Sequence, residues 1–132
     1  MSGHHVTQQR FSDAQLSRAA LTAFFAIAEQ WQLTREQERQ LLGQPPRSSF
    51  FKWRKTKDAC VDKHVLERIS YIVGIYKALR ILLPSEQAAH EWPHKPNSAP
   101  LFNGQSALDK MLAGNVIDLA DVRRYLDAER GG

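Results

Sequence analysis

The sequence has almost no cysteine and no long run of apolar residues. Cys60 is the only cysteine among 132 residues, which excludes an internal disulfide framework and suits a reducing compartment. The longest apolar run is far shorter than the roughly 20 residues that a membrane-spanning helix needs. Residues 1–10 are polar and contain no apolar core of a signal peptide. We therefore expect a cytoplasmic protein without a membrane partner.

The sequence also lacks the spacings that mark common catalytic and metal sites. It contains no glycine-rich phosphate loop, no paired cysteines and no zinc-binding helix motif. His90 and His94 are four residues apart, but Pro93 between them would break the helix that aligned their rings. Cys60 and His64 could share a helical face, yet two ligands are too few for a zinc site. We expect no enzymatic activity, no catalytic residue, no metal and no cofactor.

The sequence contains enough apolar residues to form a core: 42% of its residues are apolar and 24% are charged. Its length fits one compact domain or two small lobes that share a core. The segment from Asp62 to Leu83 dominates the pattern and predicts one helix of about six turns, which Pro84 ends. Its apolar residues recur at steps of three and four: Val65, Leu66, Ile69, Ile72, Val73, Ile75, Tyr76, Leu79, Leu82 and Leu83.

This central helix is apolar over more of its circumference than a surface helix. Only a narrow arc stays polar, formed by Lys63, Glu67, Ser70, Gly74 and Lys77. Such wide coverage predicts packing on two sides. We expect an all-α protein in which residues 61–83 join a helical region at 12–60 to a second one at 84–132, after a flexible N-terminus at 1–11.

Three helices are predicted before the central helix. Ser12 and Gln15 form a capping box for the first one. Its apolar residues make two stripes, one of Leu16, Ala20, Phe24, Ile27 and Trp31 and one of Leu21, Phe25 and Ala28. Thr34 begins a second helix that runs to Leu42, and Gly43 follows where helices often end. Pro46 suits the first position of a third helix, which would extend to about residue 57.

Two short helices joined by a glycine-containing turn are the helix-turn-helix arrangement, which commonly binds DNA. Residues 1–83 carry 13 Lys and Arg against 7 Asp and Glu, whereas residues 84–132 carry 5 against 7. The basic excess is concentrated between Arg47 and Lys57, a stretch without any acid. We predict that the DNA-contacting residues are Arg47, Ser48, Ser49, Phe51, Lys52, Arg54 and Lys55. The alternative is a solvated helix that happens to be basic.

The second half begins with a short helix from Ser85 to Trp92, which Pro93 is expected to stop. A proline-rich loop follows, and Trp92, Leu101 and Phe102 are expected to pin it to the core. Such a loop is long for a compact domain and is either ordered by packing or functional.

Two more helices are predicted at the end of the chain. Ser106 caps one that runs to Ala113, and Asp118 caps the last. The last helix would bury Leu119, Val122 and Leu126, turn Arg123, Arg124 and Asp127 outward, and leave Arg130, Gly131 and Gly132 as a free end.

These residues resemble the Xre/MbcA/ParS antitoxins. The first half carries Leu41-Leu42-Gly43 followed by Arg47-Ser48-Ser49-Phe50-Phe51-Lys52-Trp53, which is similar to the helix-turn-helix of Xre-type antitoxins. The second half carries Trp92-Pro93, Pro96-Asn97, Gly104-Gln105-Ser106 and Leu112-Ala113-Gly114 in the order of the family's toxin-binding domain. The sequence departs from the family at Pro46, where a serine often caps the recognition helix, and at Ala107, where a proline commonly stands.

The resemblance implies an antitoxin that binds a RES-domain toxin, an enzyme that consumes NAD, and blocks its active site. It also implies a homodimer that binds the promoter DNA of its own operon. The predicted toxin-binding residues are Trp92, Asn97, Phe102, Arg123, Arg124, Arg130, Gly131 and Gly132. We expect a flexible C-terminal tail to enter the NAD site while the two adjacent arginines hold the rim.

Simpler hypotheses remain open. The chain could be a stand-alone helix-turn-helix repressor without a toxin partner, or an adaptor that no longer binds DNA. Arg123 and Arg124 could equally form solvated ion pairs with the nearby Asp121 and Asp127, each contributing little.

Overall fold

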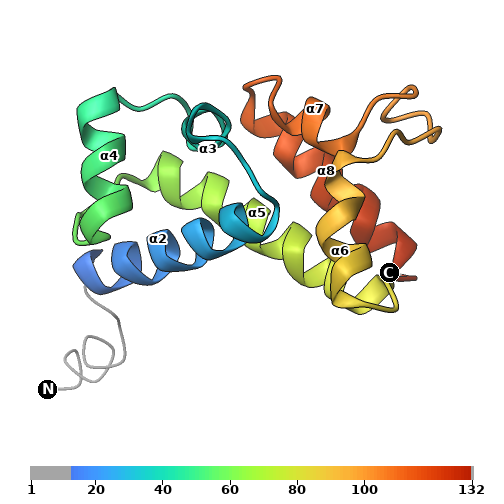
Figure 1. Ribbon diagram of the computed structural model, residues 1–132, viewed down its shortest axis with the longest axis horizontal. Helices are drawn as coiled ribbons and strands as arrows, with labels where there is room; N and C mark the ends of the chain where they lie inside the picture. Colours follow the sequence, from blue (N-terminus) through green and yellow to red (C-terminus); the bar gives the residue numbers. More distant parts are fainter. Residues whose placement is uncertain (1–12, 132) are drawn as a thin grey trace, which may run out of the picture.

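The computed structural model describes residues 13–131, and every helix or strand element named in this part of the chain is a helix (Figure 1). The elements are α2 (Asp13–Gln30), α3 (Arg35–Leu41), α4 (Arg47–Thr56), α5 (Lys63–Leu82), α6 (Glu86–Glu91), the 3₁₀ helix η1 (Trp92–His94), α7 (Ala107–Met111) and α8 (Val116–Glu129). The all-α prediction is confirmed. The expected flexible segment 1–11 and the Ser12 cap lie outside the described residues.

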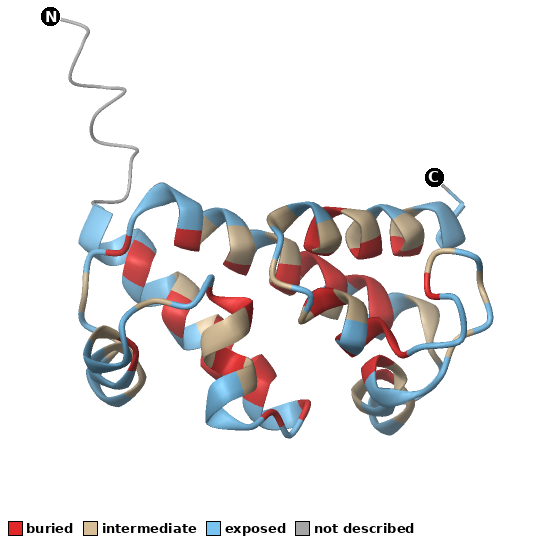
Figure 2. Ribbon diagram, turned by 90° about the horizontal axis from the view of Figure 1, so that it is seen from above, coloured by how far each residue is buried: buried red, intermediate tan, exposed pale blue. Residues whose placement is uncertain are grey.

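Helix α5 is the central element, as its sequence predicts. It runs between the group formed by α2, α3 and α4 and the group formed by α6, α7 and α8, and it packs mainly on α2 and α8 (Figure 1). Ile69, Ile72, Ile75 and Leu79 are almost fully buried. The buried stretches of the helices therefore face one another around α5 (Figure 2), and the predicted packing on two sides is confirmed.

Both ends of α5 also match the prediction. The Asp62 carboxylate accepts hydrogen bonds from the backbone N–H groups of His64 and Val65, each at 3.0 Å. Leu83 has extended backbone and ends the helix directly before Pro84. A capped start and a proline after the end thus define one continuous helix.

The polar arc of α5 was assigned wrongly at Gly74, which is buried. The guanidinium group of Arg123 lies directly over this glycine, and a Cβ atom at position 74 would collide with it. A glycine offers no side chain to bury, so its position on a helical wheel does not indicate exposure. Gly74 allows α8 to approach α5 closely.

The first turn of α2 also differs from the prediction. Leu16 is 46% exposed, whereas its neighbour Ser17 is fully buried. The Ser17 hydroxyl accepts a hydrogen bond of 3.0 Å from the backbone N–H of Val61, where the chain turns from α4 toward α5. A buried backbone N–H needs an acceptor. The Ser17 hydroxyl is that acceptor, which an apolar side chain at this position could not be.

The helix starts at Thr34 and Ser106 are confirmed, since both residues form capping boxes. The predicted cap at Asp118 is wrong. Helix α8 begins at Val116 after Asn115, and Asp118 lies in the first turn, where it accepts a hydrogen bond of 3.0 Å from Lys110 Nζ.

Helix α6 begins after Ser85 and ends at Glu91 with Trp92 as its C-cap, so the predicted stop before Pro93 is confirmed. Pro93 lies in the separate 3₁₀ helix η1, because proline is tolerated near a helix start. The following loop closes on itself through two backbone hydrogen bonds, from Asn97 N–H to Gln105 O at 3.0 Å and from Gly104 N–H to Asn97 O at 2.9 Å. This loop is therefore ordered by its own backbone pairing.

Candidate functional site

Helices α3 and α4 are joined by a tight turn that presents α4 to solvent. Gly43 and Gln44 both have positive φ, at +91° and +60°, and the N–H of Gln44 bonds back to Arg39 O at 2.9 Å. Pro46 is the N-cap residue of α4 instead of its first helical residue, and no side chain caps this end. The backbone N–H groups of the first turn are left without helical partners, which favours anions there.

The inner face of α4 is anchored by aromatic packing. Phe50 is fully buried, and its ring lies 6.0 Å from that of Phe25 on α2. Trp53 is half-buried on the same side. Phe50 belongs to the core and Trp53 packs against it, so the opposite face of α4 is the one presented to solvent.

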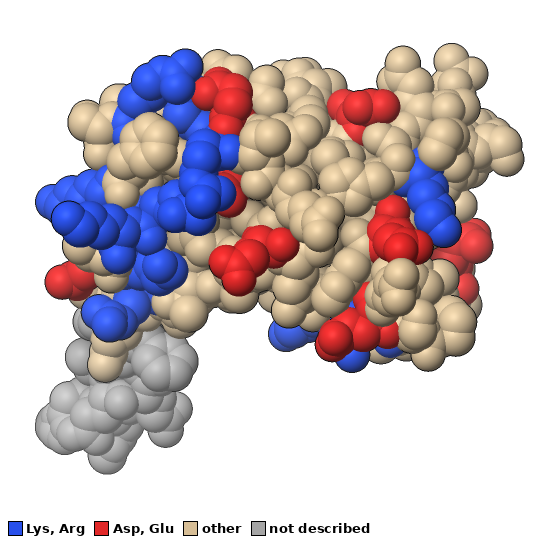
Figure 3. Space-filling view, in the orientation of Figure 1, with Lys and Arg blue, Asp and Glu red and all other residues tan. Residues whose placement is uncertain are grey.

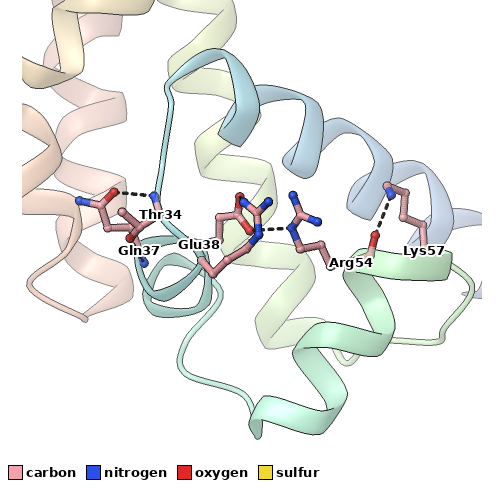
Figure 4. A network of polar contacts seen from close by, with 6 residues as sticks. Thr34, Gln37, Glu38, Arg54 and Lys57 are labelled. Atoms are coloured by element: carbon pink, nitrogen blue, oxygen red, sulfur yellow. Dashed lines mark hydrogen bonds and ion pairs between the residues drawn. The ribbon is translucent and has the colours of Figure 1, made fainter.

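A buried carboxylate ties α4 to α3. Glu38 is 2% exposed, and its oxygens lie 3.3 Å from Arg54 Nε and 3.3 Å from Arg35 Nη1 (Figure 4). Burial raises the pKa of Glu38, an effect that outweighs the opposite one of the Arg35 and Arg54 guanidinium groups. The contact between Glu38 and Arg54 thereby links the two helices of the turn motif.

Two cations of the basic stretch take part in this internal structure. Arg54 contacts Glu38, and the backbone carbonyl of Arg54 accepts a hydrogen bond of 2.8 Å from Lys57 Nζ (Figure 4). Lys57 Nζ also lies 5.6 Å from the centre of the Phe25 ring. Arg54 is thus held by α3, and its predicted contact with DNA stays a prediction.

The other residues predicted to contact DNA lie on or near the solvent face of α4. Arg47, Ser48, Lys52 and Lys55 are exposed, Phe51 is 49% exposed, and Ser49 is half-buried. Arg47 pairs with Glu36 at 3.2 Å, while within residues 13–131 neither Lys52 nor Lys55 forms an ion pair. Figure 3 shows Lys and Arg gathered over the α4 side of the molecule. The arrangement offers cations on an exposed helix that begins with uncapped N–H groups.

A second candidate surface lies on the other side of α5, beside α8. The rings of Trp92, Phe102 and Tyr125 stack edge to face, with centroids 5.8 Å and 5.1 Å apart. Phe102 is only 3% exposed, and Trp92 is half-buried. The predicted pinning of the loop is confirmed, and the burial of Phe102 does not favour its predicted direct contact with a toxin.

The loop residue Asn97 turns the chain. Its side-chain oxygen accepts a hydrogen bond of 2.9 Å from the backbone N–H of Ala99, an Asx turn. Asn97 is half-buried. It shapes the loop, and a contact with a toxin stays a prediction.

The two adjacent arginines of α8 differ in their surroundings. Arg124 is exposed and pairs with Asp121 at 2.9 Å. Arg123 was predicted to point outward, yet it lies across Gly74 and pairs with Asp127 at 3.1 Å. The ion pairs expected by the simpler hypothesis are therefore present, and Arg123 also packs against α5.

The chain end is more ordered than predicted. Helix α8 continues to Glu129, Arg130 caps it, and the N–H of Gly131 bonds to Ala128 O at 3.0 Å. The prediction of a free tail is wrong for Arg130 and Gly131, and Gly132 lies outside the described residues. A backbone hydrogen bond with glycine at φ +88° closes the helix here.

Sequence reasoning missed Arg68, which joins the two halves. Its Nη2 donates to Gly114 O at 2.9 Å and its Nη1 to Leu41 O at 3.5 Å. A signal was available, because Arg68 interrupts the apolar arc of α5 between Val65 and Ile72. A cation within an apolar face needs acceptors, and here the acceptors are a carbonyl at the end of α3 and one in the turn before α8.

Residues 13–131 hold neither a metal-binding cluster nor a membrane-spanning helix. Across residues 13–131, no group of three or more His, Cys, Asp or Glu side chains is placed to hold a metal ion. No helix within the same range is long and apolar enough to cross a membrane.

Comparison with known proteins relates both surfaces to known domains. A family model for the antitoxin Xre-like helix-turn-helix domain matches residues 10–74. A second model, for the antitoxin Xre/MbcA/ParS C-terminal toxin-binding domain, matches residues 78–132. The chain is also 48% identical over 121 residues to the uncharacterized protein y4oB of Sinorhizobium fredii, covering 92% of each chain.

Proposed function

Because the chain belongs to the Xre/MbcA/ParS antitoxins, we propose that it neutralises a RES-domain toxin and represses its own operon. The observation that carries this proposal is the placement of two distinct surfaces around α5. The exposed face of α4 lies in one group of helices, and the toxin-binding domain, with α8, lies in the other (Figure 1). One chain can then bind DNA and a protein at the same time.

The DNA-binding half of the proposal rests on α4. Arg47 and Ser48 lie in its first turn, where base-edge contacts are made by recognition helices. Lys52 and Lys55 follow on the exposed side and suit phosphate oxygens. Helix-turn-helix proteins commonly bind two half-sites about 34 Å apart as dimers, and we propose that this chain binds its promoter as a homodimer.

The toxin-binding half rests on α8 and the loop beside it. A site that accepts the pyrophosphate of NAD offers groups suited to anions. The end of α8, with Arg130, Gly131 and Gly132, is the proposed blocking element, and the carbonyl groups at this helix end carry the partial negative charge that such a site would attract. Arg124, exposed on the same helix, would contact acidic groups on the rim of the toxin site. Since α8 is helical to Glu129, the blocking element would approach as an ordered helix end.

A pair of charge reversals tests the two halves separately. The chain is co-expressed with the RES-domain protein proposed as its partner, and complex formation is measured by size-exclusion chromatography and dissociation kinetics. Arg124→Glu should speed dissociation of the toxin and leave promoter binding unchanged. Lys52→Glu, the matched control, should weaken promoter binding and leave the toxin complex unchanged.

Arg124 is preferred to Arg123 for this test because Arg123 packs over Gly74, so its reversal would also disturb folding. The toxin proposal fails if no complex forms with the wild-type chain. A promoter-binding chain without such a complex would instead be a stand-alone repressor.

A further inference from the structure

Phe51 is a large apolar side chain on the face of α4 that is presented to solvent. It is 49% exposed. Its ring meets that of Phe50 edge to face, with the centroids 5.0 Å apart and the planes at 72°. Phe50 itself is fully buried against Phe25. The Phe51 ring therefore packs on one side against a core residue.

The surroundings of Phe51 are polar and basic. Residues three and four positions away lie on the same side of a helix, which places Ser48, Arg47 and Lys55 beside the ring. All three are exposed. An apolar protein partner that covered Phe51 would have to desolvate Arg47 and Lys55, which is costly without acidic partners. An anionic partner with an apolar patch would offset this cost, because its negative groups pair with the two cations.

The major groove of DNA offers this combination. Its walls are phosphates, and the C5-methyl group of thymine is the apolar feature on its floor, which side chains such as Phe contact. Ser48 and Arg47 precede Phe51 by about one helical turn, so an α4 that inserts its first turn into the groove brings Phe51 close to the floor as well.

We propose that Phe51 contacts the 5-methyl group of a thymine in the operator and so determines base preference at that position. This inference rests on the proposed DNA-binding function of α4. The contact requires no hydrogen bond and no movement of the ring, because Phe50 already holds it at the surface. Removing one buried methyl group should weaken binding roughly fourfold.

The experiment replaces each thymine of the promoter site in turn by deoxyuridine, which lacks only the methyl group. Dissociation constants are measured for the full-length wild type and for Phe51→Ala, Phe51→Leu and Lys55→Ala. Wild type should lose about fourfold in affinity at one thymine of each half-site. Phe51→Ala should bind the thymine and deoxyuridine sites equally. Lys55→Ala should bind more weakly but keep the full deoxyuridine effect, and Phe51→Leu should keep part of it.

Two outcomes would overturn the inference while leaving DNA binding intact. One is specific promoter binding that no deoxyuridine substitution weakens. The other is a deoxyuridine effect of unchanged size in Phe51→Ala. If the wild type does not prefer its promoter over random DNA at all, the proposed function fails and this inference fails with it. Thermal unfolding of Phe51→Ala checks that the exposed substitution leaves the fold intact.

Discussion

Arg68 Nη2 donates a hydrogen bond of 2.9 Å to the backbone carbonyl of Gly114, a residue 46 positions later in the chain. The same guanidinium group reaches Leu41 O in the helix-turn-helix half. One side chain on the central helix therefore contacts both halves of the protein. It lies where the end of α3 and the turn before α8 approach α5.

Replacement of Arg68 tests how much this contact stabilises the fold. Arg68→Met keeps an apolar stem of similar length but leaves two partly buried carbonyls without their donor. We expect the free energy of unfolding to fall by about 1–3 kcal/mol. The measurement is urea unfolding followed by circular dichroism. Arg80→Met, at an exposed position on the same helix, should change little, and an equal loss in both variants would contradict the assignment.

The central helix provides a second test. Ile72 is fully buried within it, so Ile72→Ala loses both its burial and the packing around it. We expect a loss of about 2–5 kcal/mol in the free energy of unfolding. Ile81→Ala, 63% exposed on the same helix, should stay within about 0.5 kcal/mol of wild type. A loss under about 1 kcal/mol for Ile72→Ala would show that α5 is not packed on both sides.

Glu38 predicts a specific dependence of stability on pH. Burial raises its pKa in the folded chain above the ordinary value of 4.5. Folding therefore favours the protonated form, and the contribution of Glu38 is fully present below pH 4.5 and lost as pH rises through the raised pKa. Glu38→Gln cannot titrate and so lacks this dependence.

The measurement compares urea unfolding of wild type and Glu38→Gln from pH 4 to pH 7. Relative to the variant, wild type should lose stability as pH rises from about the ordinary pKa of 4.5, then level off. Glu36→Gln, an exposed change in the same helix, is the control. A wild type that gains stability relative to Glu38→Gln over this range would mean that the arginines outweigh burial.

The recognition helix gives a prediction about salt and sequence. Lys55→Ala should weaken binding to all DNA sequences alike and lower the slope of log K against log salt by about one unit. Arg47→Ala or Ser48→Ala should instead relax base preference, at a cost of about 1–3 kcal/mol for a lost bidentate contact. The readout is affinity for promoter and random DNA across salt concentrations. Equal affinity of wild type for both at every salt concentration would exclude base reading.

Local signals in the sequence predicted most of the fold. Patterns that depend only on neighbouring residues are confirmed. They are the spacing of apolar residues between Val65 and Leu83 and the capping boxes at Thr34 and Ser106. The prediction that Asp118 caps the last helix was wrong for a local reason too. An acid suits both the N-cap and the first turn, and Asn115 three residues earlier took the cap position.

Features that depend on distant contacts could not be predicted. The partner of Arg54 is Glu38, 16 residues earlier on another helix, so the basic run could not show that one of its cations is held internally. Gly74 looked polar because it has no apolar side chain, and only the crossing of Arg123 explains its burial. The sequence predicted which residues belong to each candidate surface. Only the structure shows which of them have structural contacts and which are exposed.

Neutralisation is measured most directly as NAD loss catalysed by the purified RES-domain toxin that is proposed as the partner of this chain. We expect an equimolar amount of the full chain to stop NAD loss. Deletion of residues 130–132, which removes the cap of α8 and the proposed blocking element, should leave promoter binding intact but reduce this protection. Inhibition that persists in the deleted chain would mean that the chain end is not the blocking element, and that inhibition comes from the Trp92–Phe102 loop or from the assembly as a whole. NAD loss at an undiminished rate, in a molar excess of the folded full chain, would contradict the proposed antitoxin function.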